Sequence, residues 1–180
     1  MRWLLRIVAG VIGLVAVFLA AGLLLPTQFT VERDITIAAP PEKVYSLIAD
    51  PREWKRWSVW NQRDPAMTIT YDGPASGAGA RWSWQSKSEG SGEMEFTEAK
   101  MPEGIAYRLT FAEFGMTSVG RLQLTSAEVA GKPFTRVAWT NEGDVGLNPV
   151  NRWFGAFMDR LVGPDFEAGL VNLKKLAEAQ

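Results

Sequence analysis

The longest apolar run of the chain lies at its N-terminal end. No residue from Ile7 to Leu25 carries a charge, and Pro26 follows directly. A helix over this run is roughly 28 Å long at about 1.5 Å per residue, close to the thickness of about 30 Å of a bilayer's hydrocarbon core. The pattern predicts a transmembrane helix and an anchor that occupies residues 1–26.

A cleaved signal peptide and a buried core helix are the two other interpretations of this run. The apolar part of a signal peptide usually has about 7–15 residues. The small residues Ala20, Ala21 and Gly22 also precede Leu23–Leu25, so cleavage there would leave apolar residues at the new terminus. A core helix would have a polar face, which this run lacks. We therefore favour an uncleaved anchor.

The charges beside the run indicate its orientation. Arg2 and Arg6 precede it, whereas Arg33, the first basic residue after it, is flanked by Glu32 and Asp34. Basic residues are retained preferentially on the cytoplasmic side. We expect the N-terminus in the cytoplasm and the remainder of the chain on the extracytoplasmic side.

Beyond Pro26, apolar and polar residues alternate in short segments, which is typical of strands with one buried face. The predicted strands are 31–37, 67–71, 80–85, 92–100, 105–111, 117–125 and 135–141. Between the first two, a helix begins near Pro41 and runs to Ile48, and a further helical turn carries Trp54 and Trp57. Because the turns between the later strands are too short for crossovers, neighbouring strands should be antiparallel.

The C-terminal part of the chain shows a helical pattern from about Pro149 to Ala179, with apolar residues recurring every three to five positions. Gly163-Pro164 interrupts this pattern, which predicts either a kink or two helices. An apolar helix stripe has to cover the apolar face of the sheet. The predicted fold is α+β, an antiparallel sheet of about six to seven strands wrapped around a long C-terminal helix.

Composition removes several kinds of chemistry. The 180 residues include no Cys and no His, but eight Trp. Without Cys there is no disulfide or thiolate metal site, and without His the commonest general base and metal ligand are missing. With 19 Lys+Arg and 20 Asp+Glu, the chain lacks the excess of basic residues that is typical of nucleic-acid-binding proteins. No loop of alternating carboxylates is present, so we expect neither a metal nor another cofactor.

Short motifs in a fixed order point to a known family. They are Ala39-Pro-Pro-Glu-Lys-Val-Tyr45, Asp50-Pro-Arg-Glu-Trp-Lys-Arg-Trp57, Gly77-Ala-Gly-Ala80, Gly90-Ser-Gly-Glu-Met94 and Val162-Gly-Pro-Asp-Phe-Glu-Ala-Gly-Leu170. Over residues 30–178 the chain resembles the polyketide cyclase/dehydrase branch of the START-like (SRPBCC) superfamily, which has the helix-grip fold. The resemblance implies that residues 27–180 form one ligand-binding domain with a hydrophobic cavity. It implies no reaction, since no catalytic motif is shared across this branch.

Large apolar side chains on the faces expected to point inward are the candidate lining of that cavity. The candidates are Trp54, Trp57, Trp60, Trp82, Trp84, Phe96, Tyr107, Phe111, Trp139, Phe154, Phe157, Met158 and Leu161. Their flat surfaces suit a lipid or a polycyclic ligand. The alternative is that they form ordinary core, in which case the many buried indole N–H groups would all need hydrogen-bond partners.

Other polar features have simpler explanations. Glu93 and Glu95 alternate with Met94 and Phe96, so we expect this carboxylate pair on a solvated strand face. Asp159 lies near basic residues of the helix, which favours a surface ion pair. The glycine-rich stretch 73–79 lacks the spacing of a phosphate loop and is expected to form a turn at the cavity rim.

These observations leave three functional hypotheses. The first is a membrane-anchored, non-enzymatic domain that binds a hydrophobic small molecule or lipid. The second is a cyclase- or dehydratase-type enzyme that uses a Tyr or carboxylate in the cavity, with Tyr107 as the best-placed candidate. The third is an envelope protein-interaction module. No catalytic residue is assigned, and no protein partner is identified.

Overall fold

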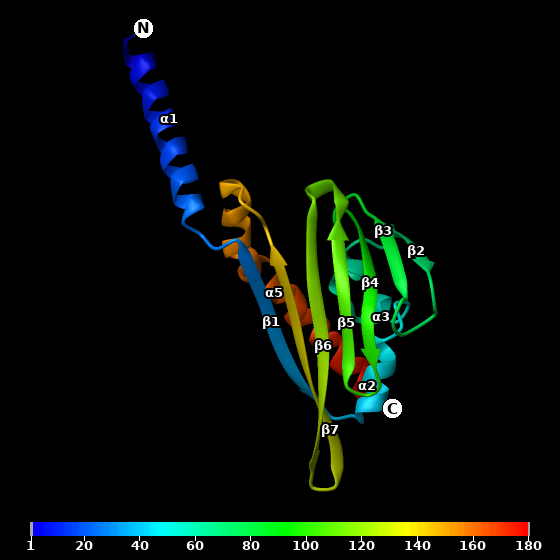
Figure 1. Cartoon of the computed structure of the whole chain (residues 1–180). Coiled ribbons are helices and arrows are strands. Elements are labelled where there is room, and N and C mark those ends of the chain that lie inside the picture. Colours follow the sequence, from blue (N-terminus) through cyan, green and yellow to red (C-terminus); the bar gives the residue numbers. More distant parts are fainter. Residues whose placement is uncertain (1, 180) are drawn as a thin grey trace.

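The computed structural model describes residues 2–179, so Met1 and Gln180, the outer limits of the two predicted domains, lie outside the described part. Its elements follow the predicted order closely (Figure 1). They are α1 (Arg2–Leu23), β1 (Gln28–Ile37), α2 (Pro41–Ile48), α3 (Trp54–Trp57), α4 (Val59–Arg63), β2 (Thr68–Asp72), β3 (Arg81–Gln85), β4 (Ser91–Lys100), β5 (Gly104–Phe111), η1 (Ala112–Phe114), β6 (Met116–Val129), β7 (Lys132–Asp144) and α5 (Pro149–Glu178).

The seven strands form one antiparallel sheet in the order β1-β7-β6-β5-β4-β3-β2. The strands β2 to β7 follow one another as a meander, as their short connections require. The first strand, β1, pairs with the last one, β7, from Gln28 opposite Asp144 to Ile37 opposite Thr135. The chain therefore has to cross from one edge of the sheet to the other between β1 and β2, and α2, α3 and α4 occupy this connection.

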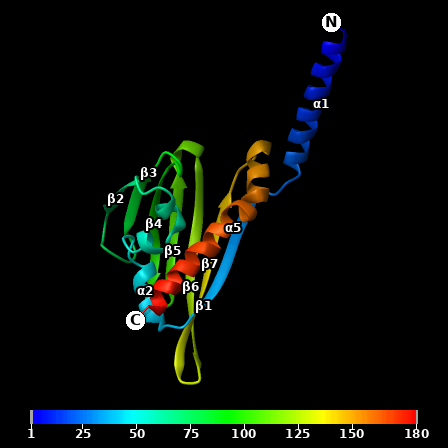
Figure 2. The same ribbon diagram turned by 180° about the vertical axis from the view of Figure 1, so that it is seen from behind.

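One face of the sheet is covered by helices, and the other is open to solvent. The long helix α5 crosses the covered face together with α2 and α3 (Figure 2). Alternate residues of β7, including Val137 and Trp139, are buried on this side. On the opposite face, Glu95 of β4 lies 3.5 Å from Arg108 of β5, in line with the solvated face expected for this strand. The structure is the predicted α+β helix-grip arrangement.

The C-terminal helix α5 is a single helix, although it contains Pro164. The two-helix alternative is therefore wrong, and the helix instead changes direction along its length (Figure 2). Its first turn is capped by Asn148, whose Oδ1 accepts a hydrogen bond from the Val150 amide at 2.9 Å. Gly163 is buried where the guanidinium of Arg33 from β1 crosses the helix, and a Cβ at this position would overlap that group.

Arg33 binds two carboxylates of α5. Its Nη1 donates to Asp159 at 2.7 Å, and its Nε donates to Glu167 at 2.6 Å. The surface ion pair expected for Asp159 is therefore present, but its partner is on the first strand and not on the helix. The hydrogen bond from Arg33 lowers the pKa of Asp159 below its usual value.

The N-terminal helix α1 projects away from the sheet (Figure 1). Among residues 2–179 it is the one helix long and apolar enough to cross a membrane. No residue of its most apolar stretch is buried against the rest of the protein. Its last turns contact the beginning of α5. The strand β1 begins a few residues later, so the end of the sheet that holds Gln28 is the end nearest α1.

Candidate ligand-binding pocket

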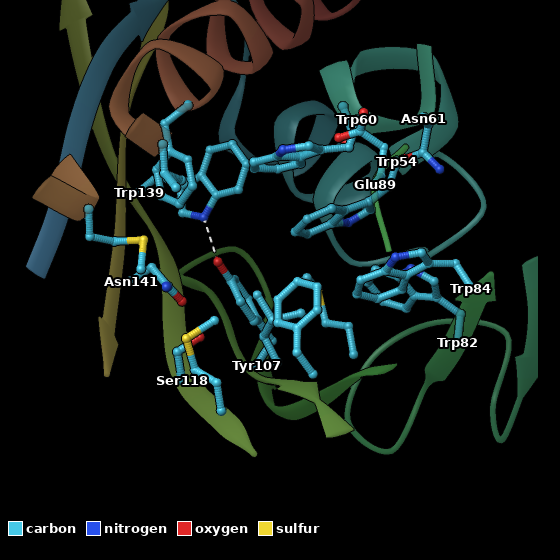
Figure 3. A pocket seen from close by; sticks show the side chains of 18 of the residues that line it. Trp54, Trp60, Asn61, Trp82, Trp84, Glu89, Tyr107, Ser118, Trp139 and Asn141 are labelled. Atoms are coloured by element: carbon cyan, nitrogen blue, oxygen red, sulfur yellow. Dashed lines mark hydrogen bonds between the residues drawn. The ribbon is translucent and has the colours of Figure 1, made fainter. Parts of the chain in front are cut away.

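A pocket of about 200 Å³ lies between the covered face of the sheet and the helices α3, α4 and α5 (Figure 3). Most of its wall is apolar. The lining residues are Phe29, Trp54, Ser58, Trp60, Asn61, Met67, Trp82, Trp84, Glu89, Met94, Tyr107, Leu109, Phe111, Met116, Ser118, Trp139, Asn141, Met158, Val162 and Phe166. We call this cavity the aromatic pocket.

The aromatic pocket lies at the end of the sheet nearest α1. Phe29 is at the start of β1, and Phe111 and Met116 are at the turn that joins β5 to β6. In the register of the sheet, Phe111 faces Met116, and Ser118 faces Gly143 close to the end of β7. At the opposite end of the sheet, α2 packs on α5, and Val44, Ile48 and Leu173 are fully buried.

Trp54 is the centre of an aromatic cluster that forms the floor of the pocket. Its ring lies 4.5 Å from that of Trp57, 5.3 Å from that of Trp82 and 5.9 Å from that of Trp139. Such tilted and edge-on arrangements are favourable for aromatic pairs. The indole N–H of Trp54 donates to the Ile48 carbonyl at 2.9 Å.

Two further buried indoles have partners as well. Trp57 donates to the Leu47 carbonyl at 3.1 Å, and Trp139 donates to the Tyr107 hydroxyl at 2.9 Å. The helix α2 ends at Ile48, separated from α3 by five residues, and its last carbonyls lie beside the two tryptophans of α3. The polar partners of these three indoles are therefore supplied by the end of a helix and by one tyrosine.

Glycines opposite aromatic residues shape the wall formed by the sheet. In the strand register Tyr107 faces Gly120, and a Cβ at position 120 would overlap the tyrosine ring. Because Gly120 has no side chain, the Tyr107 ring lies across β6 and its hydroxyl reaches Trp139 on β7. Trp84 faces Gly92, and Phe29 faces Gly143, with the same close approach of ring and backbone.

A small polar region interrupts the apolar wall, and we call it the polar corner, formed by Tyr107, Ser118 and Asn141 (Figure 3). Ser118 and Asn141 are buried. Among the described residues, Asn141 Oδ1 is a buried side-chain atom with no hydrogen-bond partner. Burial raises the pKa of Tyr107, so its phenol stays protonated at neutral pH. The corner thus combines an unpaired acceptor with hydroxyl groups.

A charged group reaches the pocket at its rim. Glu89, in the loop between β3 and β4, lies 3.6 Å from Arg63 of α4. Arg63 in turn donates to Asp165 of α5 at 2.9 Å. The hydrogen bond with Asp165 raises the pKa of Arg63, which stays charged. This ion-pair chain ties the loop, α4 and α5 together beside the pocket.

The structure brings most of the candidate residues from the sequence together. Eight of them line the aromatic pocket: Trp54, Trp60, Trp82, Trp84, Tyr107, Phe111, Trp139 and Met158. Trp57 and Phe96 do not line it, because both are fully buried in the core beneath Trp54. Whether the lining residues bind a ligand stays a prediction.

Phe154, Phe157 and Leu161 lie elsewhere than expected. They do not line the pocket, and their side chains are 58%, 46% and 58% exposed. The first turns of α5 extend past the covered face of the sheet toward α1, so this side of the helix has no strand to pack against (Figure 2).

Sequence reasoning missed several lining residues that share a face with the predicted ones. Leu109 lies between Tyr107 and Phe111 in the alternation of β5, and Asn141 follows Trp139 by two positions on β7. Because side chains alternate between the two faces of a strand, the sequence already indicated that both residues point toward the pocket side. Ser58, Asn61 and Glu89 come from short helices and a loop, for which no periodic signal exists.

Comparisons with known proteins agree with this architecture. A family model described as polyketide cyclase/dehydrase and lipid transport matches residues 28–178. No curated protein sequence matches the chain. The solved structures that resemble it have low sequence identity, so their likeness shows the fold alone.

Two of these structures serve as examples. Truncated norcoclaurine synthase from Thalictrum flavum has a TM-score of 0.62 at 10% identity, covering 85% of this chain and 95% of that chain. A protein from Chromobacterium violaceum has a TM-score of 0.60 at 16% identity, covering 84% of this chain and 99% of that chain. Since the family model spans the sheet and α5 together, the chain belongs to the polyketide cyclase/dehydrase and lipid transport family of the SRPBCC superfamily.

Proposed function

We propose that this protein is a membrane-anchored binder of an apolar small molecule or lipid segment that carries one polar group. The observation that carries the proposal is the aromatic pocket, an apolar cavity with a polar corner at one side. Such a combination of an apolar wall and a few placed polar groups is typical of ligand sites. No metal or other cofactor is part of the proposal.

The size of the pocket limits the ligand. An apolar cavity of about 150 Å³ is enough to hold benzene. A pocket of about 200 Å³ therefore suits a molecule of one or two rings, or part of an acyl chain. A sterol would need the pocket to widen. For comparison, a structure of the norcoclaurine synthase neighbour is a complex with dopamine and hydroxybenzaldehyde, which are single-ring molecules, and its likeness to this chain is one of fold.

The polar corner argues for a hydrogen-bonding group on the ligand. A buried acceptor without a partner costs about 1–3 kcal/mol, and a ligand hydroxyl that donates to Asn141 Oδ1 would remove that cost. The protonated Tyr107 hydroxyl already accepts from Trp139 and keeps its own proton for a ligand oxygen. A hydroxyl on an aromatic or acyl ligand can donate to Asn141 and accept from Tyr107, whereas a ligand carbonyl can only accept from Tyr107.

The membrane part of the proposal rests on α1. Its apolar side chains lack cover from the domain, and its end is joined to α5 by hydrogen bonds. A segment that packs on the folded domain in this way is better explained as a retained anchor than as a cleaved signal. Arg2 and Arg6 favour a cytoplasmic N-terminus, which puts the aromatic pocket on the extracytoplasmic side.

Binding is tested on the full chain in lipid nanodiscs with 1-naphthol and naphthalene as probes, followed by tryptophan fluorescence. We expect both to quench the pocket tryptophans, with 1-naphthol binding about tenfold more tightly, since one hydrogen bond is worth about 1.4 kcal/mol. Asn141→Leu should remove the preference for 1-naphthol. Gln123→Leu, on the exposed face of β6, is the matched control.

A second variant separates binding from surface adsorption. Met158→Trp places a large ring in the aromatic pocket and should abolish binding of both probes, whereas Val171→Trp on the exposed side of the same helix should leave it unchanged. The proposed function is wrong if Met158→Trp removes neither the binding of the two probes nor that of any lipid extracted from the purified protein.

One specific observation supports the enzymatic hypothesis. Tyr107 and Glu89 are titratable side chains that line the same pocket. The raised pKa of Tyr107 makes it a hydrogen-bond donor at neutral pH and a poor general base. An enzyme of this design would depend on Glu89, so turnover of a bound ligand that Glu89→Gln abolishes would favour catalysis over binding alone.

A further inference from the structure

The first turns of α5 expose more large apolar side chains than any other part of the domain beyond α1. Val150, Phe154, Phe157 and Leu161 recur on one side of the helix, and Leu147 precedes it. Their exposed fractions run from 40% for Val150 to 78% for Leu147. We call these five residues the apolar rim. A contiguous apolar surface of this kind normally marks a contact with a membrane or a partner.

The part of α5 that carries the apolar rim is attached to α1 by specific contacts of two other residues. The rings of Trp153 and Phe18 are stacked with their centroids 5.1 Å apart, and the indole N–H of Trp153 donates to the Phe18 carbonyl at 3.1 Å. Arg152 donates to the Leu23 carbonyl at 2.5 Å and to the Leu25 carbonyl at 3.2 Å. The position of α5 relative to the apolar helix is thus set by both side chains.

These contacts determine how deep α5 lies if α1 spans a bilayer. The carbonyl bound by Trp153 belongs to Phe18, which precedes the end of α1 at Leu23 by five residues, or roughly 7–8 Å along the helix axis. Interfacial amphipathic helices bury their apolar face by about 5–10 Å. The Trp153 indole therefore lies at the depth expected for the apolar face of a helix in the membrane interface.

We infer that the apolar rim inserts into the interface of the bilayer in which α1 is anchored, so that the protein contacts the membrane at a second site beside its transmembrane helix. The inference rests on the proposed anchor. Trp153 is of a residue type enriched in this layer, and the long side chain of Arg152 can keep its charge near water there. Of the nearby charges, Asp159 is paired with Arg33, and Arg160 is exposed and long enough to extend toward water.

The same helix separates the bilayer from the pocket. Phe157 and Leu161 are on its exposed side, while Met158 and Val162, one position further along, line the aromatic pocket. The pocket also lies at the end of the sheet nearest α1. Insertion of the apolar rim would therefore bring the pocket within one helix diameter of the acyl layer, which favours a ligand that partitions into membranes.

The absence of native Cys allows a direct test with single labels. Full-length variants Val11→Cys, Phe157→Cys and Val171→Cys, each labelled with an environment-sensitive fluorophore, are reconstituted into vesicles with and without brominated lipids. Val11 of α1 and Phe157 and Val171 of α5 all have exposed side chains, so labelling should not disturb the core. Circular dichroism checks that each labelled variant is folded.

The inference predicts that the label at position 157 is blue-shifted and quenched by brominated lipid at least about threefold more strongly than the label at 171, because only the former reaches the acyl layer. The label at position 11 reports the anchor. If 11 is quenched and 157 is as accessible to aqueous iodide as 171, the apolar rim does not insert and the inference is wrong, although the anchor stands. If 11 is not quenched, the anchor itself fails. A label at 157 that is shielded from iodide without lipid quenching identifies a protein partner and also overturns the inference.

Discussion

The first half of α5, residues 149–161, and its second half, residues 162–178, carry apolar residues at similar spacing but bury them in different ways. In the second half Phe166, Leu170 and Leu173 are almost fully buried against the sheet and α3. In the first half Phe154 and Leu161 are more than half exposed. The helix is the same, but the sheet and α3 bury the large apolar side chains of the second half only.

This difference shows what a helical period can and cannot report. A repeat of three and four positions identifies which side of a helix is apolar. It does not identify what covers that side, since a sheet, a membrane and a partner all select the same residues. Only the tertiary structure shows what covers each half: the sheet and α3 bury the second half, whereas the first half contacts α1 through Trp153 and leaves Phe154 and Leu161 exposed.

The largest predicted effect tests this comparison directly. Leu173→Ala should lower the free energy of unfolding by about 2–5 kcal/mol, because Leu173 is fully buried and the change leaves a cavity. Leu161→Ala, the same substitution in the exposed half, should change it by less than about 0.5 kcal/mol. Urea denaturation of the full chain in detergent micelles measures both. Equal losses would mean that the two halves are covered to the same extent in solution.

Most of the fold was predictable because its strands and helices depend on local patterns. Alternation located all seven strands to within a few residues, and the short connections required antiparallel pairing. The pairing of β1 with β7 had no local signal, since these strands lie at opposite ends of the domain sequence. The short helix α4 was also missed, because five residues are too few for a period to appear.

The pocket was predictable in part for a physical reason. Inward-facing aromatic residues of strands, such as Trp82 and Tyr107, must lie between the sheet and the helix, so alternation places them correctly. For α5 the period also selected Phe154 and Leu161, whose side faces away from the sheet. The glycines opposite aromatics were visible in the sequence, but their meaning depends on a register that only the structure provides.

A second, intermediate effect concerns the pocket end of the sheet. Gly120→Ala should lower the free energy of unfolding by about 1–3 kcal/mol, because the new Cβ would overlap the Tyr107 ring and force it to move. The displaced hydroxyl would also lose the hydrogen bond from Trp139. In a protein that already carries Tyr107→Ala, Gly120→Ala should lower the free energy of unfolding by much less. Additive losses in this double-mutant cycle would show that the close approach does not constrain the ring.

The smallest effect is expected at Arg33, which joins the two halves of α5 through Asp159 and Glu167. Because both carboxylates are largely exposed, Arg33→Ala should lower the free energy of unfolding by less than about 1 kcal/mol at pH 7. Arg121→Ala, which removes an exposed arginine 3.7 Å from Glu98 on the sheet, is the matched control.

The pH dependence of the Arg33→Ala difference separates an ion pair from simple packing. Arg33 holds the pKa of Asp159 below its usual value, so this carboxyl stabilises the fold above its unfolded pKa of about 3.9 and loses that contribution as the pH falls through the lowered value. The difference between wild type and Arg33→Ala, measured by urea denaturation from pH 7 to pH 2, should therefore shrink below about pH 4. A difference that stays constant over this range would assign the role of Arg33 to its contact with Gly163, where the two halves of the helix meet.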